Sequence, residues 1–192
     1  LRDPKIVVTP DNRLMLLALD RRMREGKQDE RNSTVWFSED GEDWGSSVRV
    51  GEPDIWLWRI TWHHGIAYGV GYADKRAFSH RPSQKEFVRL YKSKNGIQFD
   101  SLINVFFDRG YSNETSIVFR EDKTAVCLLR RDGIENSAQV GTSSPPYTKW
   151  NWKSLDVRIG GPHLLVLPDG RLVASGRLHL ADGIGIGIGF RF

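Results

Sequence analysis

The segment His163-Leu-Leu-Val-Leu-Pro-Asp-Gly-Arg-Leu-Val-Ala-Ser175 contains the pattern that decides the fold. Two short runs of β-forming residues flank Asp169-Gly170, and an Asp-Gly pair between apolar runs is a strong signal for a hairpin turn. The same arrangement of run, turn and run occurs three more times, with turns at Asp11-Asn12, His64-Gly65 and Asp122-Lys123. The four turns recur about every 50 residues, and a fixed period of this length indicates an internal repeat.

A second motif repeats between the hairpins with a similar period. Ser38-Glu-Asp-Gly-Glu-Asp-Trp44 is followed by Ser93-Lys-Asn-Gly-Ile-Gln-Phe99 and by a degenerate copy, Ser143-Ser-Pro-Pro-Tyr-Thr-Lys-Trp150. The Asp or Asn side chain can accept hydrogen bonds from the backbone of its own turn, and the aromatic residue can fold back over that turn. An apolar strand precedes each copy, so one repeat unit contains a hairpin, a third strand, this turn and a fourth strand.

Four-stranded antiparallel units at this period are typical of β-propeller blades. We therefore predict an all-β fold built of β-propeller blades, as a single domain or fragment. The approximate blades are 1–50, 51–105, 106–155 and 156–192, with the last one incomplete. A β-sandwich with chance similarity between motifs is the alternative, but two motif series with one period favour the propeller. About three and a half to four blades leave exposed edges, which a partner copy or further chain segments are expected to cover.

Composition and charge exclude several other classes of protein. The 192 residues are 39% hydrophobic and 27% charged, which suits a chain with a buried core and not a disordered one. The net charge of +4 is small and its two signs are interleaved, so we expect no nucleic-acid partner. No apolar run approaches the ~20 residues of a membrane span. The single cysteine, Cys127, excludes an internal disulfide and is expected in the core.

Three segments resemble the sialidase-like β-propellers, the family with bacterial neuraminidase (BNR) repeats. The segment 38–44 resembles the Asp-box of that family, with one residue fewer between Asp and Gly. The segment 113–131 is similar to the sialidase stretch in which Asn-Glu opens a hairpin and Arg closes it, and 161–177 resembles the following blade. At the level of blades the resemblance covers nearly the whole chain.

The resemblance also implies roles for individual residues. In sialidases of this kind three arginines hold the carboxylate of the substrate, a Glu activates a Tyr nucleophile, and an Asp serves as general acid and base. By position, Glu114 corresponds to the activating Glu. Arg130 or Arg131 corresponds to one of the carboxylate-binding arginines, and Arg177 corresponds to a second.

The chain departs from the family in three respects. The Arg-Ile-Pro motif of the family is absent, and Arg2-Asp3-Pro4 matches it only in part; Arg2 and Asp3 can equally form an exposed ion pair. No early loop offers a clear match for the catalytic Asp. The Tyr nucleophile of the family lies in a later blade, beyond Phe192. The segments that resemble the family therefore do not supply a complete catalytic set. We expect the chain to be a fragment. The sequence predicts no cellular compartment for it.

The repeat predicts a ring of equivalent residues at one end of the central channel. Counting back by equal steps from the hairpin turns gives Asp3, Trp56, Glu114 and Gly161. Residues beside these positions, or at the end of the returning strand, reach the same rim. We expect the rim to bind substrate, because polar side chains at strand ends are suited to a binding site. The expected binding residues are Arg2, Asp3, Arg59, Tyr72, Asn113, Arg130, Arg131, His163 and Arg177.

Some of these residues also have a purely structural interpretation. Trp56 and Trp58 lie two residues apart on one strand and share a face, which favours the core over a sugar-stacking surface. Arg130 and Arg131 are adjacent and point to opposite faces, so we expect one of them to be exposed to solvent. The adjacent pair His63-His64 diverges in the same way and has no third ligand in register, so no metal site is expected.

Two functions remain open from the sequence. The first is a sialidase-like glycoside hydrolase domain, or a fragment of one, that acts on or binds glycans at the channel mouth. The second is a non-catalytic propeller that binds a glycan or a protein through the same rim. The expected ligand is a carbohydrate, with an acidic sugar favoured by the arginines, and no cofactor or membrane partner is expected.

Overall fold

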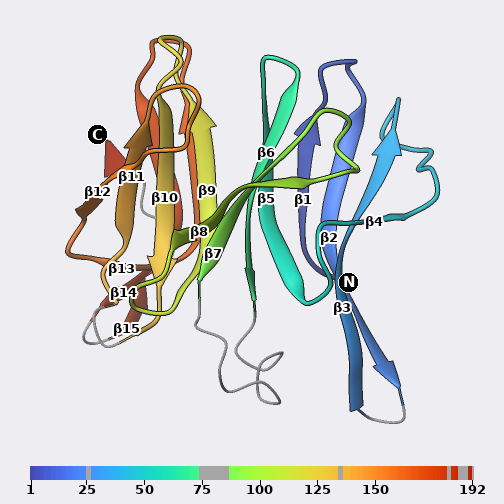
Figure 1. Ribbon diagram of the computed structural model, residues 1–192, viewed down its shortest axis with the longest axis horizontal. Helices are drawn as coiled ribbons and strands as arrows, with labels where there is room; N and C mark the ends of the chain where they lie inside the picture. Colours follow the sequence, from blue (N-terminus) through green and yellow to red (C-terminus); the bar gives the residue numbers. More distant parts are fainter. Residues whose placement is uncertain (25–26, 74–86, 134–135, 181–182, 186–189, 192) are drawn as a thin grey trace.

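A computed structural model describes residues 1–24, 27–73, 87–133, 136–180, 183–185 and 190–191. All regular secondary structure in this part of the chain is β-strand, arranged in four antiparallel sheets that follow one another along an arc (Figure 1). The prediction of an all-β fold made of propeller blades is therefore confirmed. Within the same residues, no helix is long and apolar enough to cross a membrane.

The first three sheets each contain four strands in chain order. The first sheet comprises β1 (Arg2–Val8), β2 (Leu14–Arg24), β3 (Lys27–Ser38) and β4 (Val48–Val50). The second comprises β5 (Ile55–His63), β6 (Ile66–Ala73), β7 (Val88–Ser93) and β8 (Asp100–Phe107). The third comprises β9 (Ser112–Phe119), β10 (Ala125–Arg131), β11 (Gln139–Ser143) and β12 (Asn151–Ser154).

The fourth sheet is narrower than the others. It comprises β13 (Arg158–Val166), β14 (Leu172–Leu180), β15 (Gly183–Gly185) and β16 (Phe190–Arg191). Both β15 and β16 pair with β14, on the edge opposite β13, so the sheet is three strand positions wide. This width agrees with the expected incomplete propeller.

The first strand of each sheet lies toward a common axis. Strand β5 contacts both β1 and β9, and β9 in turn contacts β13. We therefore call β1, β5, β9 and β13 the inner strands. The predicted hairpin turns connect each inner strand to the next strand of its sheet. Their backbones take positive φ, as two-residue and related tight turns require, at Asn12, His64, Gly65, Lys123 and Gly170.

The Ser-containing turns at 38–44 and 93–99 are closed by the same set of hydrogen bonds. The Ser Oγ accepts from the Gly N–H, at 2.8 Å in the first turn and 2.9 Å in the second. The Oδ1 of the Asp or Asn accepts two further backbone N–H groups, all at 2.9 Å. These local bonds stabilise the turn that carries the chain from the third strand of a blade to the fourth.

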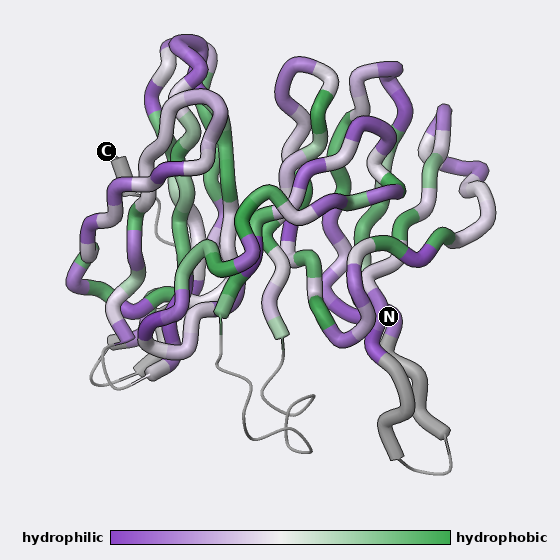
Figure 2. Tube along the Cα trace, in the orientation of Figure 1, coloured by the Kyte–Doolittle hydropathy of each residue, from purple (hydrophilic) through white to green (hydrophobic). Residues whose placement is uncertain are grey.

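Successive sheets pack face to face through apolar cores. Leu57 and Tyr91 lie fully buried between the first and second sheets, and Leu129 lies fully buried between the second and third. Cys127 is in the second of these cores, where burial raises the pKa of its thiol. Figure 2 shows hydrophobic residues along the facing strands and hydrophilic residues concentrated at the turns.

Hydroxyl groups also link the backbones of three inner strands, β5, β9 and β13, to the preceding blade. Ser33 of β3 donates to a carbonyl of β5 at 3.3 Å and accepts from an N–H of the same strand at 2.9 Å. Thr61 of β5 donates to a carbonyl of β9 at 2.7 Å. Ser116 of β9 accepts from an N–H of β13 at 3.0 Å. These bonds satisfy backbone N–H and C=O groups that are not paired within their own sheet.

Replacing Ser33 tests the contribution of these links. The substitution Ser33→Ala leaves the buried N–H of Leu57 without the hydroxyl that accepts from it, so we expect a loss of about 1–3 kcal/mol in the free energy of unfolding. Denaturant unfolding measures this loss. Ser101→Ala is the control, because the Ser101 hydroxyl is exposed and water can replace its bond to Asn104. Equal stability of the two variants would contradict the proposed link.

Candidate functional site

Each inner strand contains one extra residue at the same end of the channel. In β1 the pairing with β2 shifts between Arg2 and Lys5, and in β5 the pairing with β6 shifts between Leu57 and Arg59. Strand β9 shifts opposite Arg130, and β13 shifts between its third and sixth residues. Such β-bulges bend a strand and redirect its side chains. The four bulges at one level therefore turn side chains of β1, β5 and β9, and the backbone of Gly161 in β13, toward the axis.

The bulges correct one position of the predicted ring. Counted from the last residue of each inner strand, the equivalent residues are Asp3, Trp58, Glu114 and Gly161, so Trp58 and not Trp56 belongs to the ring. The turn between β5 and β6 has two residues, whereas the other three hairpins close through longer loops, for example from Thr9 to Arg13. Counting back from the turn therefore gives the equivalent residue in three blades, but in the second blade it gives Trp56 in place of Trp58.

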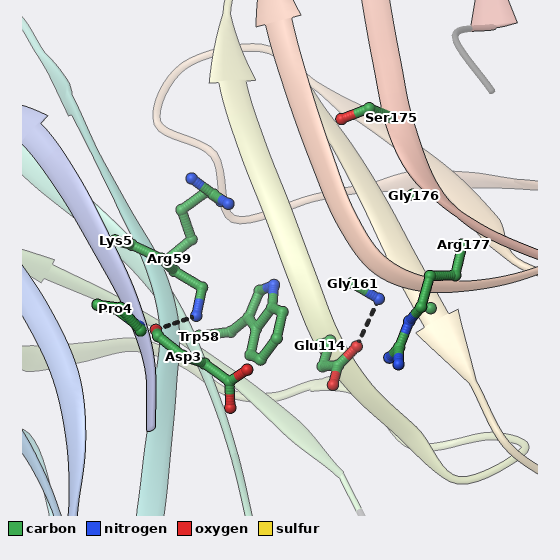
Figure 3. A pocket seen from close by; sticks show the side chains of 11 residues that line it. Asp3, Pro4, Lys5, Trp58, Arg59, Glu114, Gly161, Ser175, Gly176 and Arg177 are labelled. Carbon is green, nitrogen blue, oxygen red and sulfur yellow. Dashed lines mark hydrogen bonds between the residues drawn. The ribbon is translucent and has the colours of Figure 1, made fainter. Parts of the chain in front are cut away.

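The bulged ends surround a cavity of about 470 Å³ between the inner strands, which we call the axial pocket (Figure 3). Asp3, Lys5, Trp58 and Arg59 come from β1 and β5 and form one wall. The opposite wall comes from β9, β13 and β14. The lining residues are Asp3, Pro4, Lys5, Trp58, Arg59, Glu114, Gly160, Gly161, Ser175, Gly176 and Arg177.

Glu114 is fixed in the wall formed by β9 and β13. Its Oε2 accepts a 2.7 Å hydrogen bond from Arg130 Nη1 and another of 2.7 Å from the backbone N–H of Gly161 (Figure 3 shows the latter). Only 11% of its side chain is exposed, so the ion pair is largely shielded from water. No described residue is hydrogen-bonded to its Oε1, and this oxygen can face a ligand.

Arg130 is itself held by a second carboxylate. Its Nη2 lies 3.0 Å from Asp132 Oδ2, and its Nε donates to Asp132 Oδ1 at 3.1 Å. Asp132 also accepts from Asn113 at 2.9 Å and lies 3.4 Å from Arg158 of β13. Burial acts against the charged form of Arg130, but the two carboxylates raise its pKa. Arg130 is therefore a fully compensated cation that orients Glu114.

Lys5 and Trp58 make a compact contact in the opposite wall. The Lys5 Nζ lies 3.6 Å from the centroid of the Trp58 ring and donates to the Asp3 carbonyl at 2.7 Å. Trp58 is 5% exposed and packs edge-on against Trp56. Burial lowers the pKa of Lys5 to about 8, although the carboxylate of Asp3 opposes this shift. Trp58 thus belongs to the core, as expected, and also forms part of the pocket wall.

Arg59 and Arg177 are the two guanidinium groups in the pocket that have no carboxylate partner among the described residues. The Nε of Arg59 is buried and makes no hydrogen bond in this part of the chain, and burial lowers the pKa of the group. Arg177 is exposed, and its guanidinium lies over Gly160, where an added Cβ would come within 3.1 Å of it. A buried donor without a partner, such as the Nε of Arg59, is suited to an anionic ligand.

The structure therefore brings together Asp3, Arg59, Glu114 and Arg177 in one pocket, with Arg130 and Asn113 directly behind it. The remaining predicted binding residues lie elsewhere, as described next. Sequence reasoning did not find Lys5, Asp132 or the N–H of Gly161. Alternation along β1 would have placed Lys5 on the same face as Asp3, but its approach to Trp58 depends on the bulges of two strands.

Four predicted binding residues neither line the axial pocket nor lie directly behind it. Arg2 is exposed at the start of β1, and Tyr72 is buried against the stacked ring of Trp56. His163 is half-buried near Arg59, and burial together with that charge lowers its pKa. Arg131 points to the opposite face from Arg130 and is buried, not exposed to solvent as one of the pair was expected to be.

Arg131 can be buried because its guanidinium donates hydrogen bonds to a neighbouring loop. Its Nε donates to the Ser137 carbonyl at 2.7 Å and its Nη2 donates to the Ser137 hydroxyl at 2.8 Å. The adjacent pair His63-His64 is likewise structural, since His63 stacks on Phe119. Within the described ranges, no three His, Cys, Asp or Glu side chains gather closely enough to hold a metal ion.

The chain is similar in fold to several solved β-propellers. A protein of unknown function from Dyadobacter fermentans has a TM-score of 0.75 and 19% identity, and the match covers 95% of this chain and 58% of that one. The α-L-arabinanase of Penicillium chrysogenum has a TM-score of 0.69 and 11% identity, with 97% and 63% covered. The endo-arabinase of Bacteroides thetaiotaomicron has a TM-score of 0.70 and 14% identity, with 100% and 81% covered.

These similarities are shown by structure and not by sequence. The sequence matches no protein-family model and no curated protein. Other similar structures include a xylosidase, a fructofuranosidase and two sialidases. The chain therefore has the β-propeller fold seen in glycoside hydrolases. The similar structures do not single out sialidases among these enzymes. It spans less than two thirds of the Dyadobacter and Penicillium proteins.

Substituting Arg130 tests the ion-pair network behind the pocket. Arg130→Met leaves the carboxylates of Glu114 and Asp132 without their shared cation, so we expect a loss of about 3 kcal/mol in the free energy of unfolding at neutral pH. Denaturant unfolding at neutral pH measures this loss.

Arg177→Met is the matched control for this experiment. Arg177 has the same side chain, lines the same pocket and has no ion-pair partner among the described residues, so its loss should change stability by no more than about 0.5 kcal/mol. A similar loss in both variants would show that Arg130 contributes through packing and not through the network.

Proposed function

We propose that the chain is a glycan-binding β-propeller of the glycoside hydrolase type, and that its axial pocket binds an acidic sugar. The observation that carries the proposal is the pair Arg59 and Arg177. Both side chains line one pocket, on opposite sides of it in Figure 3, and no described carboxylate is paired with either of them. A carboxylate on the ligand would supply the missing partner, and the planar guanidinium can bind it through two hydrogen bonds.

The balance of charge in the pocket supports an anionic ligand. Arg130 is compensated by Asp132, so it leaves Glu114 bound without adding free positive charge. The other ionic groups that line the pocket are three cations and two carboxylates, which leaves an excess of positive charge. These groups are Lys5, Arg59, Arg177, Asp3 and Glu114.

The position of the pocket supports a carbohydrate ligand. It lies at the axis, where the inner strands of four blades meet, and ligand sites commonly form where several elements converge. The similar Penicillium arabinanase is complexed with arabinobiose, and a similar sialidase from Trypanosoma rangeli is in complex with sialic acid. Sialic acid combines a sugar with a carboxylate, and it is therefore the acidic sugar that we propose first.

Hydrolysis is the further step of this proposal. Glu114 and Asp3 stand on opposite sides of the pocket, and most glycoside hydrolases use two carboxylates on either side of the bond that is cleaved. We propose Glu114 as a catalytic group with its Oε1 toward the substrate. The sialidase form of the mechanism would need a Tyr for Glu114 to activate, and no Tyr is among the described residues that line the pocket.

Binding without catalysis is the second candidate function, and a specific observation favours it. The Oε2 of Glu114 is committed to Arg130 and to the N–H of Gly161, so this carboxylate already has a structural role. In that case the pocket would hold a glycan for recognition alone. The two experiments that follow separate the two functions.

The first experiment measures binding. Arg177→Ala removes a cation that has no carboxylate partner among the described residues. It should weaken the binding of N-acetylneuraminic acid by about 1.5–3 kcal/mol, which is roughly a ten- to hundredfold rise in Kd. Isothermal titration calorimetry measures the change. The control is Arg171→Ala, because Arg171 pairs with Asp169 in the hairpin loop outside the pocket. If both variants bind the sugar with equal affinity, Arg177 is not part of the binding site.

The second experiment measures turnover. Glu114→Gln keeps the size of the side chain and an oxygen that can accept from Gly161, but it loses the negative charge and the ability to exchange a proton. If the domain is a hydrolase, kcat on fluorogenic sialosides or arabinosides should fall by about 10²–10⁴-fold while the sugar still binds. Binding by the unsubstituted protein with no turnover of either substrate would instead support the non-catalytic function.

A further inference from the structure

We propose that Lys5 is a further ligand-binding residue of the axial pocket, and that its proton makes the binding of an acidic sugar depend on pH. The inference rests on the proposed function, because it assigns a third cation to the same anionic ligand. Lys5 differs from Arg59 and Arg177 in one chemical property. Arginine keeps its charge throughout the range in which proteins are stable, whereas lysine can lose its proton.

The contacts of Lys5 leave one of its donors available. An ammonium group has three N–H donors. One of them binds the Asp3 carbonyl at 2.7 Å, and the group also lies 3.6 Å from the centroid of the Trp58 ring, where it makes a cation–π contact. No other hydrogen bond to Lys5 is found among the described residues. The side chain is therefore held in place by β1 and β5 while a donor remains for a ligand in the pocket.

The surroundings of Lys5 make its charge unusually easy to remove. Burial against Trp58 disfavours the ammonium, and the charge of Arg59 on β5 adds to this effect. The carboxylates of Asp3 on β1 and Glu114 on β9 act in the opposite direction but do not cancel it, so the pKa of Lys5 falls to about 8. An anionic ligand beside the amine would favour the charged form and raise this pKa again.

Other charged groups around the pocket do not titrate in the same range. Burial and Arg59 lower the pKa of His163 on β13, so this imidazole is neutral above pH 7. Arg130 keeps its charge, because the carboxylates of Glu114 and Asp132 raise its pKa. A change in ligand affinity on the alkaline side of neutrality would therefore report on Lys5.

The sign of the pH dependence follows from these shifts. Below about pH 7 Lys5 is protonated in both the free and the bound protein, so affinity is constant. As pH rises through about 8, the free protein loses the proton that the bound protein keeps. Affinity should then fall by up to tenfold for each pH unit, and binding should take up a proton.

The experiment compares the unsubstituted protein with Lys5→Arg and Lys5→Met. Isothermal titration calorimetry with N-acetylneuraminic acid and with glucuronic acid is performed from about pH 6.5 to 9.5, in buffers of different ionisation enthalpy that reveal proton uptake. We expect the unsubstituted protein to lose affinity above pH 8 and to take up a proton there. Lys5→Arg should bind with nearly constant affinity, because its charge is permanent.

Lys5→Met separates the charge from the packing. It keeps an apolar chain against Trp58, so it should remain folded and should bind about tenfold more weakly at pH 6.5 without a pH dependence. Unfolding curves of the three proteins verify that each is folded. If the unsubstituted protein and Lys5→Arg share one pH profile, or if Lys5→Met binds as tightly as the unsubstituted protein, the role of Lys5 is wrong. If no variant binds either acid, the proposed function itself is wrong.

Discussion

One extra residue in each inner strand is the constraint on which the site depends. In a regular strand, side chains alternate between the two faces, and the faces of the inner strands belong to the cores between the sheets. The bulges interrupt this alternation at one level of β1, β5, β9 and β13. Polar and charged side chains can therefore enter the axial pocket while the residues before and after them continue to pack in the cores.

The charges brought together in this way are not equivalent. Glu114 is bound by Arg130 and by a backbone N–H of the next blade, and Asp132 in turn holds Arg130. This part of the pocket is a rigid, compensated network that connects two sheets. Arg59 and Arg177 are outside that network. The pocket thus combines a carboxylate of fixed position with cations that remain available to a ligand, which is the combination that recognition of an anionic sugar needs.

The propeller fold alone does not identify a substrate for this chain. It is shared, at low sequence identity, by enzymes as different as arabinanases, a xylosidase, a fructofuranosidase and sialidases. The proposal of an acidic sugar comes from the side chains of the pocket. In particular, it comes from the amine of Lys5 and from the guanidinium groups of Arg59 and Arg177, which have no carboxylate partner in the part of the chain that the structure describes.

The repeat, the hairpins and the Ser-containing turns could be predicted from the sequence, because they depend on residues a few positions apart that set φ or bind their own backbone. The positions of Asp3, Glu114 and Gly161 at one level followed from the same repeat. The folded structure was needed to choose Trp58 over Trp56 and Arg130 over Arg131, and to find Lys5. Each of these choices depends on where a bulge interrupts alternation, and a bulge is defined by pairing with a second strand, which no local pattern specifies.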